Sequence, residues 1–364
     1  MRPVAIPASL MRGGTSKGLF FLAENLPDDR AIRDAVLLAA MGSPDVREID
    51  GVGGAHPLTS KVAVVRRSTR EDADVDYLFL QVWPDRAEVS DRQNCGNMLA
   101  AVGPFALEEG LIAADGERTR VRIFMENTQS VAVATIETPG GEVNYDGDAR
   151  IDGVPGRHAP VPIEFLDVAG SSCGALLPTG HAADVIDGVR VTCIDNGMPV
   201  VCVRAADLGV EGHEDPLELE ANADLVRRVE SLRLAAGHLM NLGDVTTTTI
   251  PKVSLLSSGR HGGQLDTRTF IPHRVHEAIG VLGAVSVATA CLIEGSIAHD
   301  IAGGPVDTGT HDVVVEHPSG YFTVTLDVVA DGSGARIDRV SLLRTARLLM
   351  RGDVMIPRRM WEPR

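Results

Sequence analysis

Arg92-Gln93-Asn94-Cys95-Gly96-Asn97 lies between two apolar runs of different kinds. The run before it, residues 76–83, has the composition of a strand, and the run after it, residues 98–107, suits a buried helix. This order predicts a strand, a polar turn and a helix with Asn94 as its N-cap. A thiol at Cys95, in the first helical turn, would lie near unpaired backbone N–H groups, which favour the thiolate. The alternative is that Cys95 is a small buried side chain of the core.

The composition excludes several classes of partner. The chain has 364 residues, enough for two domains, with 34 basic and 50 acidic residues and a net charge of −16. Nucleic acids and anionic membranes attract basic surfaces, so neither is an expected partner. Five cysteines without a C-x-x-C pair, and no apolar segment typical of a signal peptide or membrane span, predict a reduced, cytoplasmic protein.

Two glycine-containing loops precede apolar strands in the first half. Residues 11–18 combine a Gly-Gly turn with hydroxyl and cationic side chains, which is typical of an anion-binding turn. An ordinary hairpin is the alternative. Residues 50–61 lead from glycines to Lys61, the first residue of a buried strand. Burial favours the neutral amine, which suits acid–base work, but a lysine whose stem packs while its head reaches water fits equally well.

The second half repeats the order of the first. It contains a strand with a glycine turn (189–200), an amphipathic helix (217–236), a lysine that opens a strand (Lys252) and a buried helix (281–293). Such self-similarity indicates duplication of a strand-rich unit that carries one central helix.

The repeat predicts two similar domains, residues 1–185 and 186–364, with a small-molecule site in the cleft between them. The halves differ where chemistry is expected, because only the first has a thiol, Cys95, at the start of its buried helix. The corresponding second-half turn contains glycines, whose bare N–H groups suit a carboxylate. Arginine and histidine before that turn would supply local positive charge, although each is individually more typical of a solvated or core side chain.

Three segments resemble the PrpF-type isomerases, and the resemblance runs nearly end to end. They are residues 11–18, 53–61 and 94–97. Four further segments are most similar to the 4-oxalomesaconate tautomerase branch of that family. They are residues 122–128, 151–156, 193–199 and 283–291. The resemblance implies an α+β, diaminopimelate-epimerase-like fold, in which two similar domains each form a curved, mostly antiparallel β-sheet or barrel around a central α-helix. It places the active site in the cleft between them.

The resemblance also implies a cofactor-independent isomerase that moves a proton on an unsaturated keto-tricarboxylate of aromatic-compound catabolism. The family's catalytic residues map onto Lys61 and Cys95, and which of the two is base and which is acid stays open. The second half lacks the second thiol of the epimerases. His56-Pro57 departs from the tautomerase branch, so substrate choice also stays open. The alternatives are keto–enol or allylic isomerisation of 4-oxalomesaconate, 2-methylaconitate cis–trans isomerisation, and a non-catalytic tricarboxylate-binding accessory protein.

The predicted substrate-binding residues offer side-chain donors or bare backbone N–H groups to carboxylates. They are Arg12, Gly14, Thr15, Ser16, His56, Thr59, Ser60, Asn94, Gly96, Asn97, Arg268, His273, Gly280 and Gly283. No metal or cofactor is expected, because a proton shift needs none and no histidine pair has metal-ligand spacing. The expected partner is a small polycarboxylate, and a homodimer is the ordinary assembly for such a chain.

Overall fold

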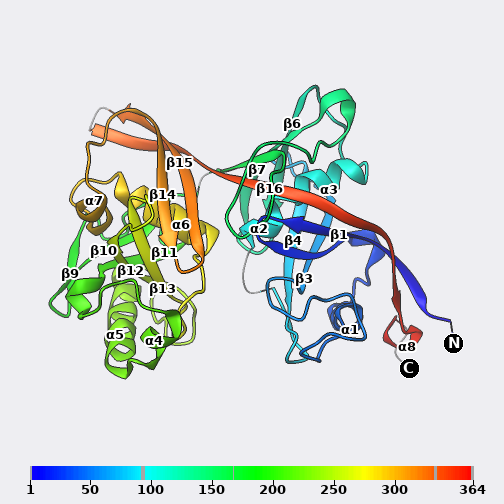
Figure 1. Ribbon diagram of the computed structural model, residues 1–364, viewed down its shortest axis with the longest axis horizontal. Helices are drawn as coiled ribbons and strands as arrows, with labels where there is room; N and C mark the ends of the chain where they lie inside the picture. The colour runs from blue at the N-terminus through cyan, green and yellow to red at the C-terminus, as the bar shows by residue number, and fades with distance from the viewer. Residues whose placement is uncertain (1, 92–94, 167, 332–333, 362–364) are drawn as a thin grey trace. The chain divides into compact units, whose positions relative to one another are not determined.

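The structure is a computed structural model that describes residues 2–91, 95–166, 168–331 and 334–361 (Figure 1). It divides into two compact units, Met1–Glu164 with Leu343–Arg364, and Phe165–Leu342. The units therefore change at residue 164 rather than at 185, and the last segment returns to unit 1. The segment after residue 165 belongs to unit 2 because Gly170 N donates to Asp195 O, at 2.7 Å.

Before the C-terminal segment, the described residues of unit 1 form eight strands or strand parts with helices between them. The elements are β1 (Val4–Gly13), β2 (Ser16–Leu22), α1 (Arg30–Met41), β3 (Lys61–Arg67), β4 (Val75–Val82), β5 (Val89–Ser90), α2 (Gly96–Leu99), α3 (Val102–Glu108), β6 (Arg118–Met125), β7 (Ser130–Glu137), β8 (Pro160–Phe165) and α8 (Arg358–Trp361). The long strand β16 (Gly334–Ile356) contributes its second part to this unit.

The strands of unit 1 surround its central helices. Their order is β1-β2-β3-β4-β6-β7-β8, and β8 neighbours β16, which pairs with β1 from Val4↔Ile356 to Gly13↔Ala346. The strand order therefore closes on itself. Helix α2 contacts β1 and β2, and α3 contacts β3, β6 and β7. This arrangement places the start of α2 next to the β1–β2 hairpin.

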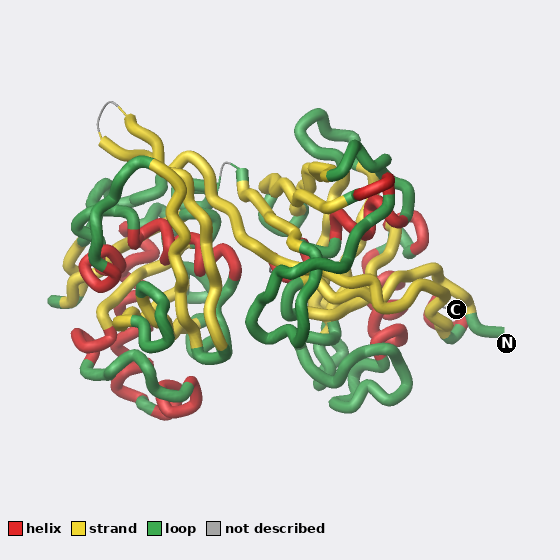
Figure 2. Tube along the Cα trace, turned by 45° about the horizontal axis from the view of Figure 1, so that its top comes forward, coloured by secondary structure: helices red, strands yellow, loops and turns green. Residues whose placement is uncertain are grey.

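Unit 2 is likewise strand-rich, as the colouring of Figure 2 shows. Its elements are β9 (Asp184–Ile186), β10 (Val189–Asp195), β11 (Pro199–Arg204), α4 (Pro216–Ala221), α5 (Ala223–Leu239), β12 (Lys252–Ser258), β13 (Leu265–Phe270), α6 (Val281–Cys291), α7 (Ile297–Ala302), β14 (Gly309–His317), β15 (Gly320–Asp331) and the first part of β16. Helix α6 contacts β10, β11, β14 and β15.

The strand pairings confirm the predicted repeat. In unit 1, β1–β2, β3–β4 and β6–β7 are antiparallel, while β2–β3 and β4–β6 are parallel. In unit 2, β10–β11, β12–β13 and β14–β15 are antiparallel, while β11–β12 and β13–β14 are parallel. The two halves thus share one order of pairings, and the strands of each half contact a buried helix, α3 in unit 1 and α6 in unit 2.

Two long helices predicted from the sequence are each divided in the structure. The helix after Cys95 splits into α2 and α3, joined by a tighter turn in which Ala101 N donates to Met98 O, at 3.0 Å. Pro104 favours this break because it has no backbone N–H with which to continue the helical hydrogen bonds. The helix predicted for residues 217–236 splits at Asn222, whose side chain accepts from Leu225 N and caps α5.

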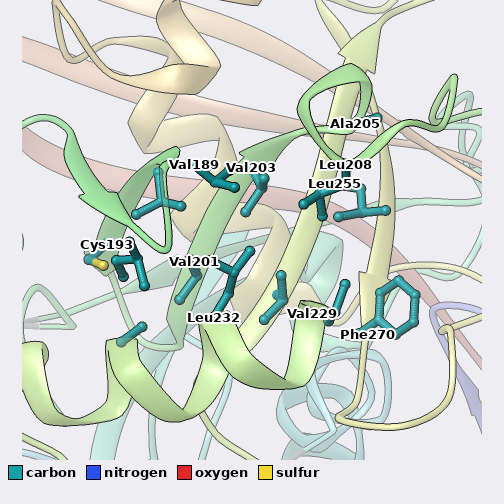
Figure 3. Packing of buried hydrophobic residues seen from close by; sticks show 14 of the residues in the cluster. Val189, Cys193, Val201, Val203, Ala205, Leu208, Val229, Leu232, Leu255 and Phe270 are labelled. Carbon is teal, nitrogen blue, oxygen red and sulfur yellow. The ribbon is translucent and has the colours of Figure 1, made fainter. Parts of the chain in front are cut away.

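A cluster of buried apolar side chains fixes α5 on the sheet of unit 2. Figure 3 shows Val229 and Leu232 of α5 against Leu255 of β12 and Val203 of β11. The apolar face of α1 packs on β2, β3 and β4 in unit 1 in the same way. Asp29 caps α1 and Gly42 ends it in the left-handed region, at φ 84°. Within the described residues, no helix has the length and apolar composition that crossing a bilayer requires.

Candidate functional site

The position of Lys61 follows from strand pairing. It is the first residue of β3, in parallel register with Gly18 of β2. A Cβ added at Gly18 would lie 2.1 Å from Lys61 O, so only glycine allows this approach. Val62 and Val64 pack on α1. Because side chains alternate along a strand, Lys61 lies on the opposite face, which α3 contacts.

Lys61 and Cys95 are in direct contact. Lys61 Nζ donates to Cys95 Sγ at 3.3 Å and to Ser16 Oγ at 2.9 Å. Lys61 is 7% exposed and Cys95 is 8% exposed, so water screens this pair little. Lys61 Nζ also lies 5.7 Å from the centroid of the Phe79 ring, whose face attracts a cation. The structure therefore brings together the two predicted catalytic side chains and the predicted binding residue Ser16.

Cys95 takes the place predicted for Asn94 at the helix start. It is the N-cap of α2, with extended backbone angles, and its carbonyl accepts from Leu99 N at 3.0 Å. Asn94 lies outside the described residues. The buried Tyr77 hydroxyl donates to Cys95 O at 3.3 Å. Burial raises the pKa of Tyr77, and the neighbouring Cys95 raises it further, so this phenol stays a neutral donor.

The residues predicted to form an anion-binding turn form a two-residue β-hairpin. Gly13 pairs with Ser16, and Gly14 adopts the left-handed region at φ 51°. Gly14 N donates to Thr345 O at 2.9 Å, so this N–H is already used inside the protein. Asn97 Nδ2 donates to Thr15 Oγ1 at 3.1 Å. The hairpin is thus fastened to the first turn of α2, which also holds Gly96.

Arg12 keeps a buried donor next to the hairpin. Its Nη1 donates to Gly14 O, Thr345 O and Thr345 Oγ1, each at 3.0 Å. Its Nη2 is buried and has no hydrogen-bond partner in the described part of the chain. Burial lowers the pKa of Arg12 to about 10, with a further contribution from Arg347. A guanidinium with an unmatched N–H is suited to bind a carboxylate.

The loop before Lys61 depends on an acidic residue that the sequence did not indicate. Glu48 is 2% exposed, and its carboxylate accepts from Ser60 Oγ at 2.5 Å, Ala55 N at 2.7 Å and Ser43 Oγ at 3.0 Å. Glu48 adopts φ 47°, which is strained for a side chain of this size. Ser60, predicted to bind substrate, uses its hydroxyl to donate this hydrogen bond to Glu48. No local sequence pattern in this polar loop predicts that Glu48 is buried and accepts these hydrogen bonds.

His56 and Thr59 lie in the same loop. Thr59 N donates to His56 O at 2.9 Å, and His56 Nδ1 accepts from Leu58 N at 3.1 Å. His56 is exposed and Thr59 is half-buried. Leu58 O accepts from Lys17 N at 3.0 Å, which joins this loop to β2. The loop is therefore tied to the hairpin that carries Ser16, while the described side chains that accept hydrogen bonds from Lys61 are Ser16 and Cys95 rather than His56 or Thr59.

Arg268 is part of a buried network in unit 2. Its Nη1 donates to Asp266 Oδ1 at 2.8 Å, and its Nε and Nη2 donate to Glu214 O at 2.8 Å and His213 O at 3.0 Å. Asp266 Oδ2 lies 3.0 Å from His213 Nδ1. These hydrogen bonds hold the loop before α4 in place, so the Arg268 guanidinium has a structural role. They do not support the predicted substrate contact.

Among the described residues, Arg268 forms its hydrogen bonds with residues other than the remaining predicted second-half residues. The His273 side chain is 62% exposed, and its Nδ1 lies 3.9 Å from Glu230 Oε2. Gly280 is the N-cap of α6, and Gly283 is buried inside that helix, as the sequence predicted. Ala284 N donates to Gly280 O at 2.8 Å, which closes the first turn.

The remaining thiols differ from Cys95 in their surroundings. None of the five cysteines, all within the described residues, forms a disulfide. Burial raises the pKa of Cys173, Cys193 and Cys291 to about 12, and raises that of Cys202 still further. These four are therefore protonated at neutral pH and packed in unit 2.

No group of three or more His, Cys, Asp or Glu side chains in the described residues is arranged to hold a metal ion. A surface hollow of about 240 Å³ occurs in unit 2. It is lined by Asp187, Val189, Leu208, Arg227, Arg228, Ser231 and Leu232.

Known proteins similar to this chain point to one family. The family described as PrpF protein matches residues 3–357. The chain is 60% identical over 350 residues to the (4E)-oxalomesaconate Delta-isomerase of Novosphingobium sp. (strain KA1), which covers 96% of this chain and 97% of that protein. It is 58% identical over 367 residues to the 4-oxalomesaconate tautomerase of Pseudomonas putida, which covers 99% of each.

Solved structures agree with these sequence matches. The crystal structure of methylitaconate-delta-isomerase aligns with a TM-score of 0.85 and 33% identity, over 100% of this chain and 98% of that one. A hydroxyproline epimerase from Agrobacterium vitis aligns with a TM-score of 0.52 and 14% identity, over 98% and 94%, a likeness in fold alone. The predicted epimerase-like α+β fold is thereby confirmed.

Proposed function

This chain is an isomerase of the PrpF family, and from that premise we propose that it moves a proton on 4-oxalomesaconate, an unsaturated keto-tricarboxylate. The relatives named for this compound are 60% and 58% identical to the chain. The structural relative named for methylitaconate is 33% identical. This difference in identity supports 4-oxalomesaconate over methylitaconate as the substrate.

The observation that carries the proposal is the buried hydrogen bond between Lys61 Nζ and Cys95 Sγ, at 3.3 Å. A proton shift between two carbons requires one group that removes a proton and one that supplies a proton. An amine and a thiol in contact can do both and can exchange a proton with each other. Because the two side chains are buried, little water screens their charges, and the electrostatic interaction between amine and thiol is stronger than in water.

The proposed reaction conserves protons and electrons without a co-reactant. Lys61, as a neutral amine, removes a proton from a carbon next to the conjugated carbonyl, and the C–H electron pair enters the π-system. Negative charge spreads onto keto and carboxylate oxygens, where fixed donors stabilise it. The Cys95 thiol then gives a proton to the far carbon or to the oxygen. Proton transfer from the Lys61 ammonium to the Cys95 thiolate restores both groups. If Cys95 is instead the base, as a thiolate, and the Lys61 ammonium is the acid, the restoring proton transfer runs from the Cys95 thiol to the Lys61 amine.

Neighbouring donors in unit 1 support an anionic substrate. The unmatched Arg12 Nη2 is the strongest candidate for a carboxylate contact. Ser16 Oγ holds Lys61 in place at 2.9 Å. Thr15 and Asn97 tie the hairpin to α2 and so fix the distance between these groups. His56, Thr59, Gly96, Gly280 and Gly283 stay predicted binding residues.

The test is product analysis by NMR after turnover of 4-oxalomesaconate in D₂O. We expect wild-type protein to incorporate deuterium, and Lys61→Ala to lower kcat by about 10³-fold, because general acid–base groups contribute about 10²–10⁴-fold. Cys95→Ser should also lower kcat, whereas Cys202→Ala, which removes a buried thiol elsewhere, should not. Wild-type turnover by Lys61→Ala would refute the role of Lys61.

The same experiment separates the remaining chemical alternatives. The position of deuterium distinguishes keto–enol tautomerisation from an allylic double-bond shift. An ultraviolet assay with 2-methylaconitate gives the second comparison, and a higher kcat/KM for that acid would refute the proposed substrate.

The proposal includes a reducing, cytoplasmic setting and a small-molecule polycarboxylate as the partner. Five cysteines without a disulfide and a net charge of −16 support it. The charge argues against nucleic-acid and membrane partners, and we retain a homodimer as the expected assembly. Size-exclusion chromatography with light scattering tests the assembly.

A further inference from the structure

Strand β4 carries a row of buried side chains beside Lys61. Tyr77, Phe79 and Gln81 alternate along this strand and are at most 2% exposed. Gln81 is paired with Lys61 of β3, and residues directly opposite each other in a sheet lie on the same face. Leu80 points the other way, into the apolar cluster under α1. The row therefore lies on the face of the sheet that carries Lys61.

Each member of the row contacts part of the predicted catalytic site. The centroid of the Phe79 ring lies 5.7 Å from Lys61 Nζ. Gln81 Nε2 donates, at 3.2 Å, to the carbonyl oxygen of the residue that immediately precedes Lys61. The Tyr77 hydroxyl donates to Cys95 O at 3.3 Å. One strand thus contacts both the segment that carries the amine and the segment that carries the thiol.

The helix that follows Cys95 is too short to orient this residue. Cys95 is the N-cap of α2, which spans only Gly96–Leu99. The Cys95 carbonyl accepts the first helical hydrogen bond, from Leu99 N at 3.0 Å. Isolated helices of fewer than about 12 residues are marginal in water, because the first turn is costly to form. The orientation of Cys95 therefore depends on contacts outside α2.

Tyr77 supplies such a contact from the sheet. It is 0% exposed, and in the part of the chain that the structure describes the acceptor of its hydroxyl is Cys95 O. This carbonyl shares a rigid peptide plane with the Cys95 Cα. A hydrogen bond to the carbonyl restricts rotation of that plane, and so restricts the direction in which the Cα–Cβ bond points. The phenol therefore acts on the thiol through the backbone.

Asn127 fastens the chain on the other side of residues 92–94, which lie outside the described residues. Its Oδ1 accepts from Phe79 N at 2.8 Å, and its Nδ2 donates to Phe79 O at 3.0 Å. The same Nδ2 donates to Asp91 O at 2.8 Å. The chain before residues 92–94 is thus attached to β4, just as Tyr77 attaches the chain after them.

We propose that Tyr77 and Asn127 are positioning residues that hold Cys95 Sγ within hydrogen-bonding distance of Lys61 Nζ. Pairing with β3 places the amine, and hydrogen bonds from the two side chains place the thiol, so β4 supports both groups. Neither residue is assigned a contact with the substrate. A misplacement of reacting groups by about 1 Å can lower a rate by about 10²-fold, so these hydrogen bonds should affect kcat. The inference rests on the proposed function for the acid used in the assay.

Kinetics on 4-oxalomesaconate test the proposal with matched tyrosine variants. Tyr77→Phe keeps the buried ring and removes the hydroxyl, so kcat of the folded protein should fall about tenfold or more while KM stays within about threefold of wild type. Tyr145→Phe removes a hydroxyl that donates at the same distance, 3.3 Å, to Glu108 Oε1 in the same unit, and it should match wild type. An unchanged kcat in Tyr77→Phe, or an equal loss in Tyr145→Phe, would overturn the proposal.

A second pair of variants tests Asn127 and decides the question if Tyr77→Phe does not fold. Asn127→Asp keeps Oδ1 as an acceptor and removes both donated hydrogen bonds, so kcat should again fall about tenfold with KM within about threefold of wild type. Asn144→Asp removes the hydrogen bonds that Asn144 Nδ2 donates to Glu137 Oε2 and Asp146 O, and it should match wild type. Wild-type kcat in Asn127→Asp would refute the role of Asn127.

Lysine NMR gives a readout that does not depend on turnover. The chain has three lysines, Lys17, Lys61 and Lys252, so protein labelled with ¹³C at lysine Cε gives one Hε–Cε signal set for each. Tyr77→Phe should move the Lys61 signal, because the thiol beside the amine changes position, and should leave the other two in place. Tyr145→Phe should move none. An unmoved Lys61 signal in folded Tyr77→Phe would refute the positioning role, whereas absence of turnover by wild type would refute the proposed function alone.

Discussion

Neighbouring side chains decide what an amine does in this protein. Lys61 has a hydroxyl at 2.9 Å and a thiol at 3.3 Å, so it has partners for proton exchange. Lys252 opens β12 as Lys61 opens β3, but no hydroxyl or thiol in the described part of the chain forms a hydrogen bond with it. Arg12 and Arg268 also differ in their neighbours. Within the described residues, Arg12 has a buried N–H without a hydrogen-bond partner, whereas Arg268 donates hydrogen bonds to protein oxygens from Nε, Nη1 and Nη2.

The uncompensated charge at Lys252 predicts a pH-dependent stability. Its pKa is about 8 in the folded protein and about 10.4 in an unfolded chain, so the unfolded state binds more protons between these values. The cost of the folded ammonium is therefore fully present below pH 8 and disappears as pH rises toward 10.4. Lys252→Met should be more stable than wild type at pH 7, by about 1–3 kcal/mol.

Urea unfolding of both proteins at pH 7, 8.5 and 10 measures this difference. The advantage of Lys252→Met should shrink steadily as pH rises, because neutral lysine and methionine impose no charge on the site. Other titrating groups are common to both proteins and cancel in the comparison. An advantage that stays constant with pH would contradict the depressed pKa of Lys252.

At the scale of elements, the loop between α1 and β3 acts as a support for Lys61. Its conformation depends on Glu48, whose carboxylate accepts hydrogen bonds from Ser43, Ala55 and Ser60. Gly53 is required beside it, because an added Cβ would lie 2.2 Å from the carboxylate. The loop thus positions the residue that immediately precedes Lys61.

Removal of this anchor should affect both stability and catalysis. Glu48→Ala leaves buried donors without an acceptor and should lower the free energy of unfolding by about 2 kcal/mol or more. It should also lower kcat, because Lys61 loses the support of Ser60. Thermal unfolding and steady-state kinetics check this, with Glu24→Ala, at an exposed position in the same unit, as the control. Unchanged kcat in a destabilised Glu48→Ala protein would limit Glu48 to a structural role.

At the scale of the whole molecule, the C-terminal strand makes unit 1 discontinuous in sequence. The second part of β16 pairs with β1 along its length, and Thr345 accepts hydrogen bonds from Arg12 and Gly14. The hairpin at the candidate site is therefore held by residues more than 300 positions away. Without β16, β1 loses the strand that pairs with it and the apolar side chains of β16 that pack beside its own.

This discontinuity predicts that the first part of the chain cannot fold alone. A fragment of residues 1–185 lacks the strand that pairs with β1, so it should show no cooperative thermal unfolding by circular dichroism. Addition of a peptide covering residues 343–364 should restore cooperative unfolding, whereas a scrambled peptide should not. A fragment 1–185 that unfolds cooperatively near the full-length Tm would refute the prediction.

The sequence alone determined the repeat and the strand-rich units around buried helices, because apolar runs and glycine turns are local or periodic features. Local patterns left the roles of Lys61 and Cys95 open, and the resemblance to the PrpF-type isomerases selected these two residues. The tertiary structure decided which predicted side chains meet, because contacts such as Lys61 with Ser16 arise from strand register. It also placed the unit boundary, since pairing of β16 with β1 joins distant segments, and it revealed Glu48 and the unpartnered Lys252. Burial and partners depend on the folded packing, and no local pattern in the chain encodes them.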